Sequence, residues 1–561
     1  MKKQIAIYRA GDFMPSTLQK VRMEYQPLLP PLLDDLHSLA LVSTGNLVGK
    51  DSALVNLFPH TYQQPPLKVV KSQIQKQFPM RIGFVFSGGQ AAGGHNIASG
   101  LFDSLKKLHV DSQLFGFLGG PAGIIKNKYI EINAEMLASY RNQGGFNLIG
   151  AGRTKIETSE QFLAAAQTVK ELKLDGLVIV GGDDSNTNAA LLAEYFLSQG
   201  MATKVIGVPK TIDGDLKNEF IELSFGFDSA TKTYSEFVGN ILIDALSAEK
   251  YTFFIKLMGR TASHIVLEVA LNTHPNLALI GEEVEAQGWT LQDITHLIAN
   301  LIMERARIGK NYGAILIPEG LIEFIPECKI LIKELNALLS AEQTYAKKIE
   351  ALIPNQEKIN YIKSFLSLKA QQSLQTLPED IQMQLLLDRD PHGNVQVTKI
   401  DTERLLIETV RQELTKRLAQ DSFVVKFNPQ PLFCGYEGRA CLPSNFDSQY
   451  CYTLGHLATL LIQAGATGYM ACIQKLNEPI ENWELSGVPL VSMIHLEERH
   501  GKAKPVIKKA LVELTSPIFN YFKQERVKWR LNDDYISPGP MQFFGPEEIT
   551  PSKPFTLMNQ K

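Results

Sequence analysis

The chain has 561 residues, of which 44% are hydrophobic and 20% charged, a composition that indicates a soluble globular protein large enough for two or more domains. Its formal net charge of −3 gives no electrostatic reason to expect nucleic acid or an anionic membrane as a partner. No apolar run reaches the ~18 residues that a membrane span needs, and the basic start of the chain lacks the apolar core of a secretory signal. Five cysteines without a CxxC pair indicate reduced thiols, so we expect a cytoplasmic protein.

Glycine-rich turns follow the first predicted strand and recur twice. Residues 82–86 predict a buried strand, which leads into the turn 87–96 and then into a predicted helix. Such a turn exposes backbone N–H groups and a helix N-terminus to an anion, although glycines also gather where backbones simply pack closely. Further glycine-rich turns lie at 116–123 and at 150–154, where Arg153 can bind a phosphate with two hydrogen bonds.

Two adjacent acids, Asp183 and Asp184, follow the predicted strand 177–180. A predicted helix comes next and stops at Gly200. A carboxylate at a strand end can hold Mg²⁺, which commonly takes one or two carboxylates together with substrate phosphate oxygens. The alternative is that these acids cap the helix N-terminus. Capping explains one acid, but two acids beside Gly-Gly favour a role with metal and phosphate.

The most informative stretch is 209–218, Pro-Lys-Thr-Ile-Asp-Gly-Asp-Leu-Lys-Asn, which follows the predicted strand 205–208. Its charged groups therefore lie at the carboxyl end of a strand, where open α/β sheets bind ligands. On a turn that contains glycine, one of Asp213 and Asp215 can accept a proton while the other holds position, a metal or a charge partner. With Lys210 on the same loop, this composition favours proton abstraction from a hydroxyl beside phosphate groups. A turn held by ordinary salt bridges is the alternative.

The rest of the chain predicts further strand, turn and helix units. Strands are predicted at 253–255 and 314–317, and the repetition implies parallel βαβ units in sheets covered on both faces. Residues 326–420 carry helix-face patterns without chemical motifs, which predicts a helical insertion. Residues 428–445 predict a loop that presents a tyrosine and an arginine, and no motif is recognisable after residue 476.

Seven of these segments together resemble the phosphofructokinase family, and within it the long-form pyrophosphate-dependent branch. In family order they are GGQAAGGHN at 88–96, GGDDS at 181–185, PKTIDGD at 209–215, GFDSA at 226–230, MGR at 258–260, PEG at 318–320 and YEGR at 436–439. Each motif alone is weak, but seven in sequence are specific. The resemblance implies an α/β fold class, with two Rossmann-like three-layer domains of the phosphofructokinase type, a helical insertion and an N-terminal extension.

The resemblance also implies a division of roles along the chain. The expected parts are an N-terminal extension (1–77), a diphosphate- and magnesium-binding α/β domain (78–245 plus 441–475), a fructose 6-phosphate-binding α/β domain that includes the insertion (246–440), and a C-terminal segment (476–561). The implied reaction is reversible, Mg²⁺-dependent phosphoryl transfer from diphosphate to the 1-hydroxyl of fructose 6-phosphate. Its products are fructose 1,6-bisphosphate and phosphate.

The matched motifs imply a role for each site residue. Asp213 matches the proton acceptor and Asp183 the magnesium-associated aspartate, while Asp215 and Thr211 match neighbours that position substrate and metal. The implied diphosphate positions are Gly89, Arg153, Asp184 and Lys210. The implied sugar-phosphate positions are Met258, Gly259, Arg260, Glu319, Tyr436 and Arg439, with the arginines suited to the 6-phosphate and the glutamate to sugar hydroxyls. Lys250 and Tyr251 match residues presented across a subunit contact, so a homodimer is expected.

Two of these positions bear on the phosphoryl donor, because ATP-using members of the family typically have glycine at both. Asp184 occupies the room of the α-phosphate and nucleoside and repels a further phosphate; at ~4 Å two like charges cost roughly 1 to 4 kcal/mol. Lys210 neutralises the terminal phosphates of a short donor, so the pair favours diphosphate over ATP. Two alternatives stay open, an ATP-dependent phosphofructokinase and a non-catalytic regulatory subunit. The intact site residues argue against the second.

Overall fold

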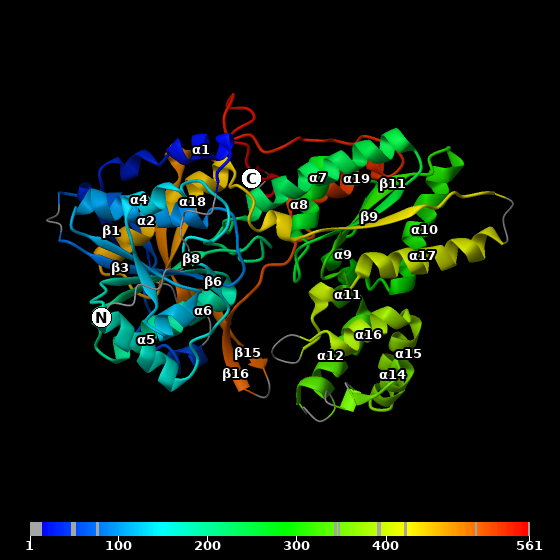
Figure 1. Ribbon diagram of the computed structural model, residues 1–561, viewed down its shortest axis with the longest axis horizontal. Helices are drawn as coiled ribbons and strands as arrows, with labels where there is room; N and C mark the ends of the chain where they lie inside the picture. The colour runs from blue at the N-terminus through cyan, green and yellow to red at the C-terminus, as the bar shows by residue number, and fades with distance from the viewer. Residues whose placement is uncertain are drawn as a thin grey trace. The chain divides into compact units, whose positions relative to one another are not determined.

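In the computed structural model the described residues are 14–45, 52–74, 78–341, 345, 348–349, 351–389, 394–419, 423–499 and 502–558. They fall into two compact units (Figure 1). Unit 1 takes its residues from Met1–Thr233, Glu437–Ala510 and Met541–Gln560, and unit 2 takes them from Tyr234–Tyr436 and Leu511–Pro540. Each unit is therefore built from segments that lie far apart in the sequence.

Unit 1 is organised around a ten-stranded sheet. Its strands are β1 (Leu39–Ser43), β2 (Leu67–Lys71), β3 (Arg81–Ser87), β4 (Gln113–Phe117), β5 (Tyr129–Ile132), β6 (Ala151–Gly152), β7 (Gly176–Gly181), β8 (Lys204–Pro209), β13 (Tyr469–Gln474) and β14 (Glu484–Pro489). The order is β1-β2-β14-β13-β8-β7-β3-β4-β5, with β6 paired to β3. The central strands β13, β8, β7, β3 and β4 run parallel, and antiparallel pairs extend both edges.

The helices of unit 1 are α1 (Thr17–Glu24), α2 (Gly94–Leu108), α3 (Pro121–Ile125), α4 (Ala134–Ala138), α5 (Ser159–Glu171), α6 (Asp183–Ser198), α18 (Asn445–Gln463) and α20 (Phe555–Met558). Of these, α2, α3, α6 and α18 contact strands of the sheet. Strand residues Leu177 and Ile179 pack in one buried cluster with Val169 of α5 and Phe196 of α6. Strand β7 is buried along its whole length and β8 at every residue except Lys204, which explains why they appear in the sequence as short continuous apolar runs.

A two-stranded antiparallel hairpin, β15 (Ile494–Arg499) and β16 (Lys502–Ile507), also belongs to unit 1. Figure 1 shows this hairpin beside α6, and β16 packs against that helix. Ile494 and Ile507 are buried in the same core cluster as Leu192 of α6. The hairpin is therefore anchored to the body of the unit by apolar contacts.

Unit 2 contains a four-stranded parallel sheet in the order β10-β11-β9-β12. The strands are β9 (Thr252–Leu257), β10 (Leu277–Ala278), β11 (Gly313–Pro318) and β12 (Pro429–Cys434). Its helices are α8 (His264–Thr273), α9 (Gly281–Gln287), α10 (Leu291–Arg307), α11 (Leu321–Phe324), α12 (Pro326–Ala341), α14 (Asn355–Lys363), α15 (Leu368–Thr376), α16 (Glu379–Leu387), α17 (Thr402–Leu418) and α19 (Pro517–Trp529). Helix α7 (Phe227–Ala248) begins with residues of unit 1 and continues with residues of unit 2. The predicted helical insertion is confirmed, and its helices bury Leu335, Ile362 and Leu374 together.

One sequence-based prediction is wrong. Residues 428–445 were expected to be a loop, but 429–434 form strand β12 at the edge of the unit 2 sheet. Two prolines, Pro429 and Pro431, made the segment resemble a loop. An edge strand tolerates proline because the N–H groups on its outer side have no strand partner to lose.

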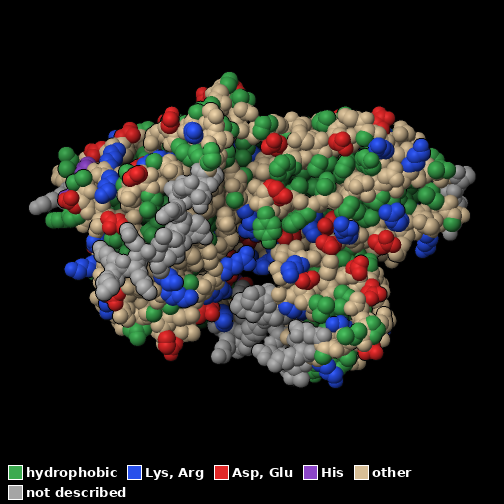
Figure 2. All heavy atoms as spheres, in the orientation of Figure 1, with side chains coloured by type: hydrophobic (Ala, Val, Ile, Leu, Met, Phe, Trp, Pro, Cys, Tyr) green, Lys and Arg blue, Asp and Glu red, His purple; other side chains and the backbone are tan. Residues whose placement is uncertain are grey.

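Charged side chains of both signs are interspersed over the face seen in Figure 2, in keeping with the small net charge of the chain. Within the described ranges, no helix combines the length and the apolar character needed to cross a lipid bilayer.

Candidate active site

Four turns of unit 1 meet because the strands that precede them are parallel and in register. Phe86 of β3 pairs with Val180 of β7, and Gly181 at the end of β7 pairs with Pro209 at the end of β8. The short strand β6 pairs with the end of β3, where the N–H of Gly88 donates to the carbonyl of Gly152 at 2.8 Å. The sheet register alone therefore brings the turns beginning at residues 88, 153, 182 and 210 to one edge.

Three cationic side chains surround the turn at Gly89. Lys210 donates its ammonium to the Gly89 carbonyl at 2.8 Å. A Cβ atom added at Gly89 would collide with the guanidinium of Arg439 and would lie 3.9 Å from Nη2 of Arg153. Glycine at this position therefore leaves room for the guanidinium of Arg439 beside the backbone. A turn lined by three cations is an electrostatic site for an anion.

The buried position of Lys210 changes its acidity. Burial lowers the pKa of the Lys210 ammonium to about 8, and the positive charge of Arg439 adds to the fall. The carboxylate of Asp213 acts in the opposite direction. An ammonium held beside two guanidinium groups in this way is destabilised until an anion neutralises the cluster.

Asp213 and Asp215 lie beside this cationic turn. The Thr211 hydroxyl accepts a hydrogen bond from the N–H of Asp213 at 3.1 Å, and Gly214 has a φ of 72°, so the chain reverses tightly between the two acids. Loss of hydration raises the pKa of Asp213 to about 6, and the neighbouring Asp215 carboxylate adds to the rise. The Asp213 side chain remains partly exposed. A reachable carboxylate with a pKa near neutrality is suited to accepting a proton.

The two acids at the start of α6 lie just inside the helix and face lysines. The N-cap residue is Gly182, so neither acid occupies the N-cap position. Asp183 faces Lys509, whereas Asp184 forms an ion pair with Lys155 at 3.1 Å. Burial raises the pKa of Asp183 above its usual value, with Lys509 opposing the rise. The capping interpretation is therefore wrong for the N-cap position, although the Asp183 carboxylate accepts a hydrogen bond from the backbone N–H of Asp184 in the first turn.

Lys509 is a site residue that the sequence did not reveal. Its ammonium lies 3.7 Å from Asp183 and 3.4 Å from Asp215, so it sits between the acids of two different turns. The next residue, Ala510, donates its N–H to the carbonyl of Asp215 at 2.7 Å. Lys509 follows strand β16 in the C-terminal part of the chain, where no local motif distinguishes it from the neighbouring Lys508.

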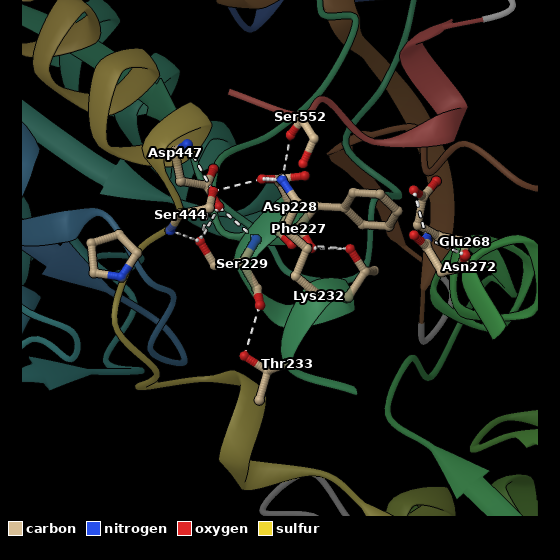
Figure 3. Close-up of polar contacts among 12 residues, drawn as sticks. Phe227, Asp228, Ser229, Lys232, Thr233, Glu268, Asn272, Ser444, Asp447 and Ser552 are labelled. Atoms are coloured by element: carbon tan, nitrogen blue, oxygen red, sulfur yellow. Dashed lines mark hydrogen bonds and ion pairs between the residues drawn. The ribbon is translucent and has the colours of Figure 1, made fainter. Parts of the chain in front are cut away.

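A buried polar network joins the start of α7, which follows the 209–225 loop, to the start of α18, which follows the segment that carries Arg439 (Figure 3). Asp447 of α18 accepts hydrogen bonds from the N–H groups of Gly226 at 3.0 Å and Ser229 at 2.9 Å. Ser444 donates its hydroxyl to Asp228 at 2.6 Å, and its N–H donates to the Ser229 hydroxyl at 2.9 Å. Loss of hydration raises the pKa of Asp447 to about 7, and the carboxylate of Asp228 adds to the rise. The network ties the end of the 209–225 loop to the segment that carries Arg439.

Unit 2 brings together a second group of predicted site residues by the same geometry. Leu257 at the end of β9 pairs with Pro318 of β11 and with Cys434 of β12, so the segments that follow all three strands emerge at one edge. The N–H of Gly259 donates to the buried carboxylate of Glu319 at 3.2 Å. The residues that emerge together at this edge are Met258, Gly259, Arg260, Glu319 and Tyr436.

Arg260 and Tyr436 are the exposed members of this group. Arg260 is exposed at the end of the segment that follows β9. The Tyr436 side chain is 76% exposed. Both side chains are therefore accessible to a ligand within unit 2.

Lys250 and Tyr251 are not part of this group within one chain. They precede β9, whereas Arg260 follows its other end, and a strand of this length separates the two ends by about 20 Å. The Lys250 ammonium lies over the Tyr251 ring, 4.9 Å from its centroid. The structure thus separates this pair from the other predicted sugar-phosphate residues of unit 2.

The acids of unit 1 match the way proteins usually hold Mg²⁺. Among the residues that the structure describes, no three His, Cys, Asp or Glu side chains form a ready-made metal cage. Asp183 and Asp215 instead present two hard oxygen donors that share one cationic neighbour. Mg²⁺ commonly takes one or two carboxylates and completes its coordination with substrate phosphates and water, so these residues fit the ion.

Comparison with known proteins agrees with this organisation. The family model described as Phosphofructokinase matches residues 81–462. The pyrophosphate--fructose 6-phosphate 1-phosphotransferase of Treponema pallidum (strain Nichols) is 51% identical over 556 residues, covering 97% of this chain and 96% of the relative. The protein of the same name from Porphyromonas gingivalis is 48% identical, covering 97% of this chain and 99% of the relative.

A solved structure supports the fold at much lower sequence identity. The pyrophosphate-dependent phosphofructokinase from Nitrosospira multiformis superposes with a TM-score of 0.53 and 14% identity, covering 81% of this chain and 93% of that one. The family match and the relatives extend over both units and include every predicted site residue. This chain belongs to the phosphofructokinase family, in its pyrophosphate-dependent branch.

Proposed function

We propose that this protein transfers a phosphoryl group reversibly from diphosphate to the 1-hydroxyl of fructose 6-phosphate, giving fructose 1,6-bisphosphate and phosphate. Relatives with this activity in their names align over nearly the whole chain at about half identity. The observation that carries the proposal is the juxtaposition of a carboxylate of raised pKa, Asp213, with the three cations around Gly89. Proton acceptance and phosphate binding are the two tasks of this reaction.

Unit 1 supplies the proton acceptor and the donor-binding groups in this assignment. Asp213 takes the proton of the sugar 1-hydroxyl as its oxygen attacks the terminal phosphorus of diphosphate. The bond from that phosphorus to the bridging oxygen breaks, and phosphate leaves with the bridging electrons. Lys210 and Arg153 stabilise the charge on the phosphates, while Thr211 holds the backbone of Asp213 in place.

Unit 2 supplies the sugar-phosphate groups. Arg260 binds the 6-phosphate, Glu319 accepts hydrogen bonds from sugar hydroxyls, and Met258, Gly259 and Tyr436 line the site. Arg439 is assigned to the 6-phosphate by its motif, and its position beside Gly89 adds positive charge to the donor turn as well. Lys250 and Tyr251 reach a sugar phosphate only in a second copy of the chain, because β9 separates them from Arg260, and we therefore propose a homodimer.

Asp183 holds Mg²⁺ in this proposal, with Asp215 beside it. When bound, the ion withdraws charge from the phosphate oxygens and so favours attack on phosphorus. Asp184 and Lys210 select diphosphate over ATP, as expected for residues that stand where nucleotide users have glycine. We also propose a cytoplasmic location, since all five cysteines are free thiols.

The direct test is an assay of the purified full chain with fructose 6-phosphate, Mg²⁺ and either diphosphate or ATP. Formation of fructose 1,6-bisphosphate with diphosphate, at a kcat/KM at least a hundredfold above that with ATP, supports the proposal. Equal use of ATP identifies an ATP-dependent enzyme instead. Binding of fructose 6-phosphate without turnover of either donor identifies a non-catalytic subunit.

A further inference from the structure

We propose that Lys509 is a diphosphate-binding residue of this active site, supplied by the C-terminal segment rather than by any of the recognised motifs. The inference rests on the proposed function and deepens it. Its starting observation is the position of the Lys509 ammonium between Asp183 and Asp215, two carboxylates that belong to different turns of the candidate site.

The backbone fixes Lys509 at this place. The N–H of Ala510 donates to the carbonyl of Asp215 at 2.7 Å, which attaches the C-terminal segment to the loop that carries Asp213. Immediately upstream, Ile507 of β16 is buried in the core cluster that contains Leu192 of α6. The hairpin thus packs on the helix that begins at Asp183 (Figure 1). Lys509, two residues beyond the end of β16, lies beside Asp183 and Asp215.

The Lys509 ammonium lies close to both acids and is accessible to a ligand. It is 3.4 Å from Asp215 and 3.7 Å from Asp183. The Lys509 side chain is 31% exposed, so a ligand can reach it. Lysine also has a flexible four-carbon stem and three donors that rotate freely. The ammonium can therefore turn from the acids to an incoming anion without movement of the backbone.

The charges of the site favour that exchange. Before ligands bind, Lys509 offsets the mutual repulsion of carboxylates that lie close together. Asp183 and Asp215 would hold a divalent cation through these same oxygens, and the charge of the ion would then offset the repulsion between the carboxylates and repel the Lys509 ammonium. The negatively charged oxygens of diphosphate then provide a new ion-pair partner for the Lys509 ammonium. No bond is made or broken in this role, which is one of binding.

A purely structural salt bridge is the competing interpretation. A partly exposed ion pair contributes little to folding, so loss of Lys509 would barely change stability. That interpretation predicts no change in the affinity for diphosphate. The affinity of the variant for inorganic diphosphate therefore separates the two interpretations.

The neighbouring Lys508 offers a matched control, because its side chain is exposed and its replacement removes the same charge one residue away. Lys509→Gln, Lys509→Arg and Lys508→Gln are compared with the wild type by calorimetric titration of inorganic diphosphate, without and with Mg²⁺, and by KM for each substrate. Thermal unfolding confirms that each variant is folded.

We expect Lys509→Gln to weaken diphosphate binding about tenfold to a hundredfold, the range for loss of one charged hydrogen bond, without a matching rise in the KM for fructose 6-phosphate. Lys509→Arg should restore most of the affinity, and Lys508→Gln should leave it unchanged. Unchanged affinity in Lys509→Gln, or an equal loss in Lys508→Gln, overturns the inference. A wild type that binds diphosphate but does not turn it over contradicts the proposed function alone, since the binding comparison still decides the role of Lys509.

Discussion

Replacement of Asp184 by glycine tests how this site distinguishes diphosphate from ATP. A nucleotide donor would bring an additional phosphate toward Asp184, and two unit charges at 4 Å repel by about 1 kcal/mol in water and about 4 kcal/mol at an intermediate dielectric. The Asp184 side chain is 55% exposed and is paired with Lys155 at 3.1 Å. Solvent and Lys155 both screen its charge, so the electrostatic contribution lies near the lower of these values.

A loss of about 1 kcal/mol of repulsion corresponds to about a fivefold gain in kcat/KM for ATP relative to diphosphate. Asp184→Asn removes the charge but keeps the volume, so it should give the electrostatic part alone. Asp184→Gly should exceed it by the steric part. The assay measures kcat/KM for both donors at saturating fructose 6-phosphate in all three proteins. An unchanged ratio of ATP to diphosphate use in Asp184→Gly would refute the assignment of this residue as the donor selector.

Three further outcomes follow from the same geometry. The plot of kcat/KM against pH should be bell-shaped. Protonation removes the Asp213 base below its pKa of about 6, and deprotonation removes the Lys210 charge above its pKa of about 8. A flat profile between pH 5 and 9 would count against both roles. Gly89→Ala should raise the KM for diphosphate at least tenfold while thermal stability changes little, because its Cβ displaces the flexible end of Arg439, and an unaltered KM would show that this turn does not bind the donor. Asp447→Asn should reveal a pH-dependent difference in the free energy of unfolding. Because the pKa of the buried acid is raised from 3.8 to about 7, its contribution to stability is lost as pH rises from about 4 to about 7. The excess free energy of unfolding of the wild type over the variant, measured in urea, should therefore shrink across that interval, and a constant difference would contradict the shift.

Much of the fold was predictable because the central strands are buried on both faces. The runs at 82–86, 177–180 and 205–208 are apolar along their length, and each ends in glycine or charged residues. Strand β12 was missed because its prolines lie at a sheet edge, which is a property of the tertiary structure. The local sequence of a strand does not show whether that strand will lie at the edge of a sheet.

The candidate site was predictable only where its residues share a motif. Lys210 and Asp213 lie on one loop, so their proximity could be inferred from the chain itself. Arg439 reaches the Gly89 turn from a segment far along the chain, and Lys509 arrives after a hairpin with no motif. Their positions depend on sheet register and on core packing of α6 and β16, which local patterns do not encode.

The central claim is that Asp213 accepts the proton of the sugar hydroxyl. Its most direct test is the kcat of Asp213→Asn, a neutral variant of nearly the same shape, together with calorimetric titration of diphosphate to confirm that the site is intact. General-base removal should lower kcat by about 10² to 10⁴, with diphosphate affinity retained within a few fold. A kcat within tenfold of the wild type, in a variant that still binds diphosphate, would contradict the account.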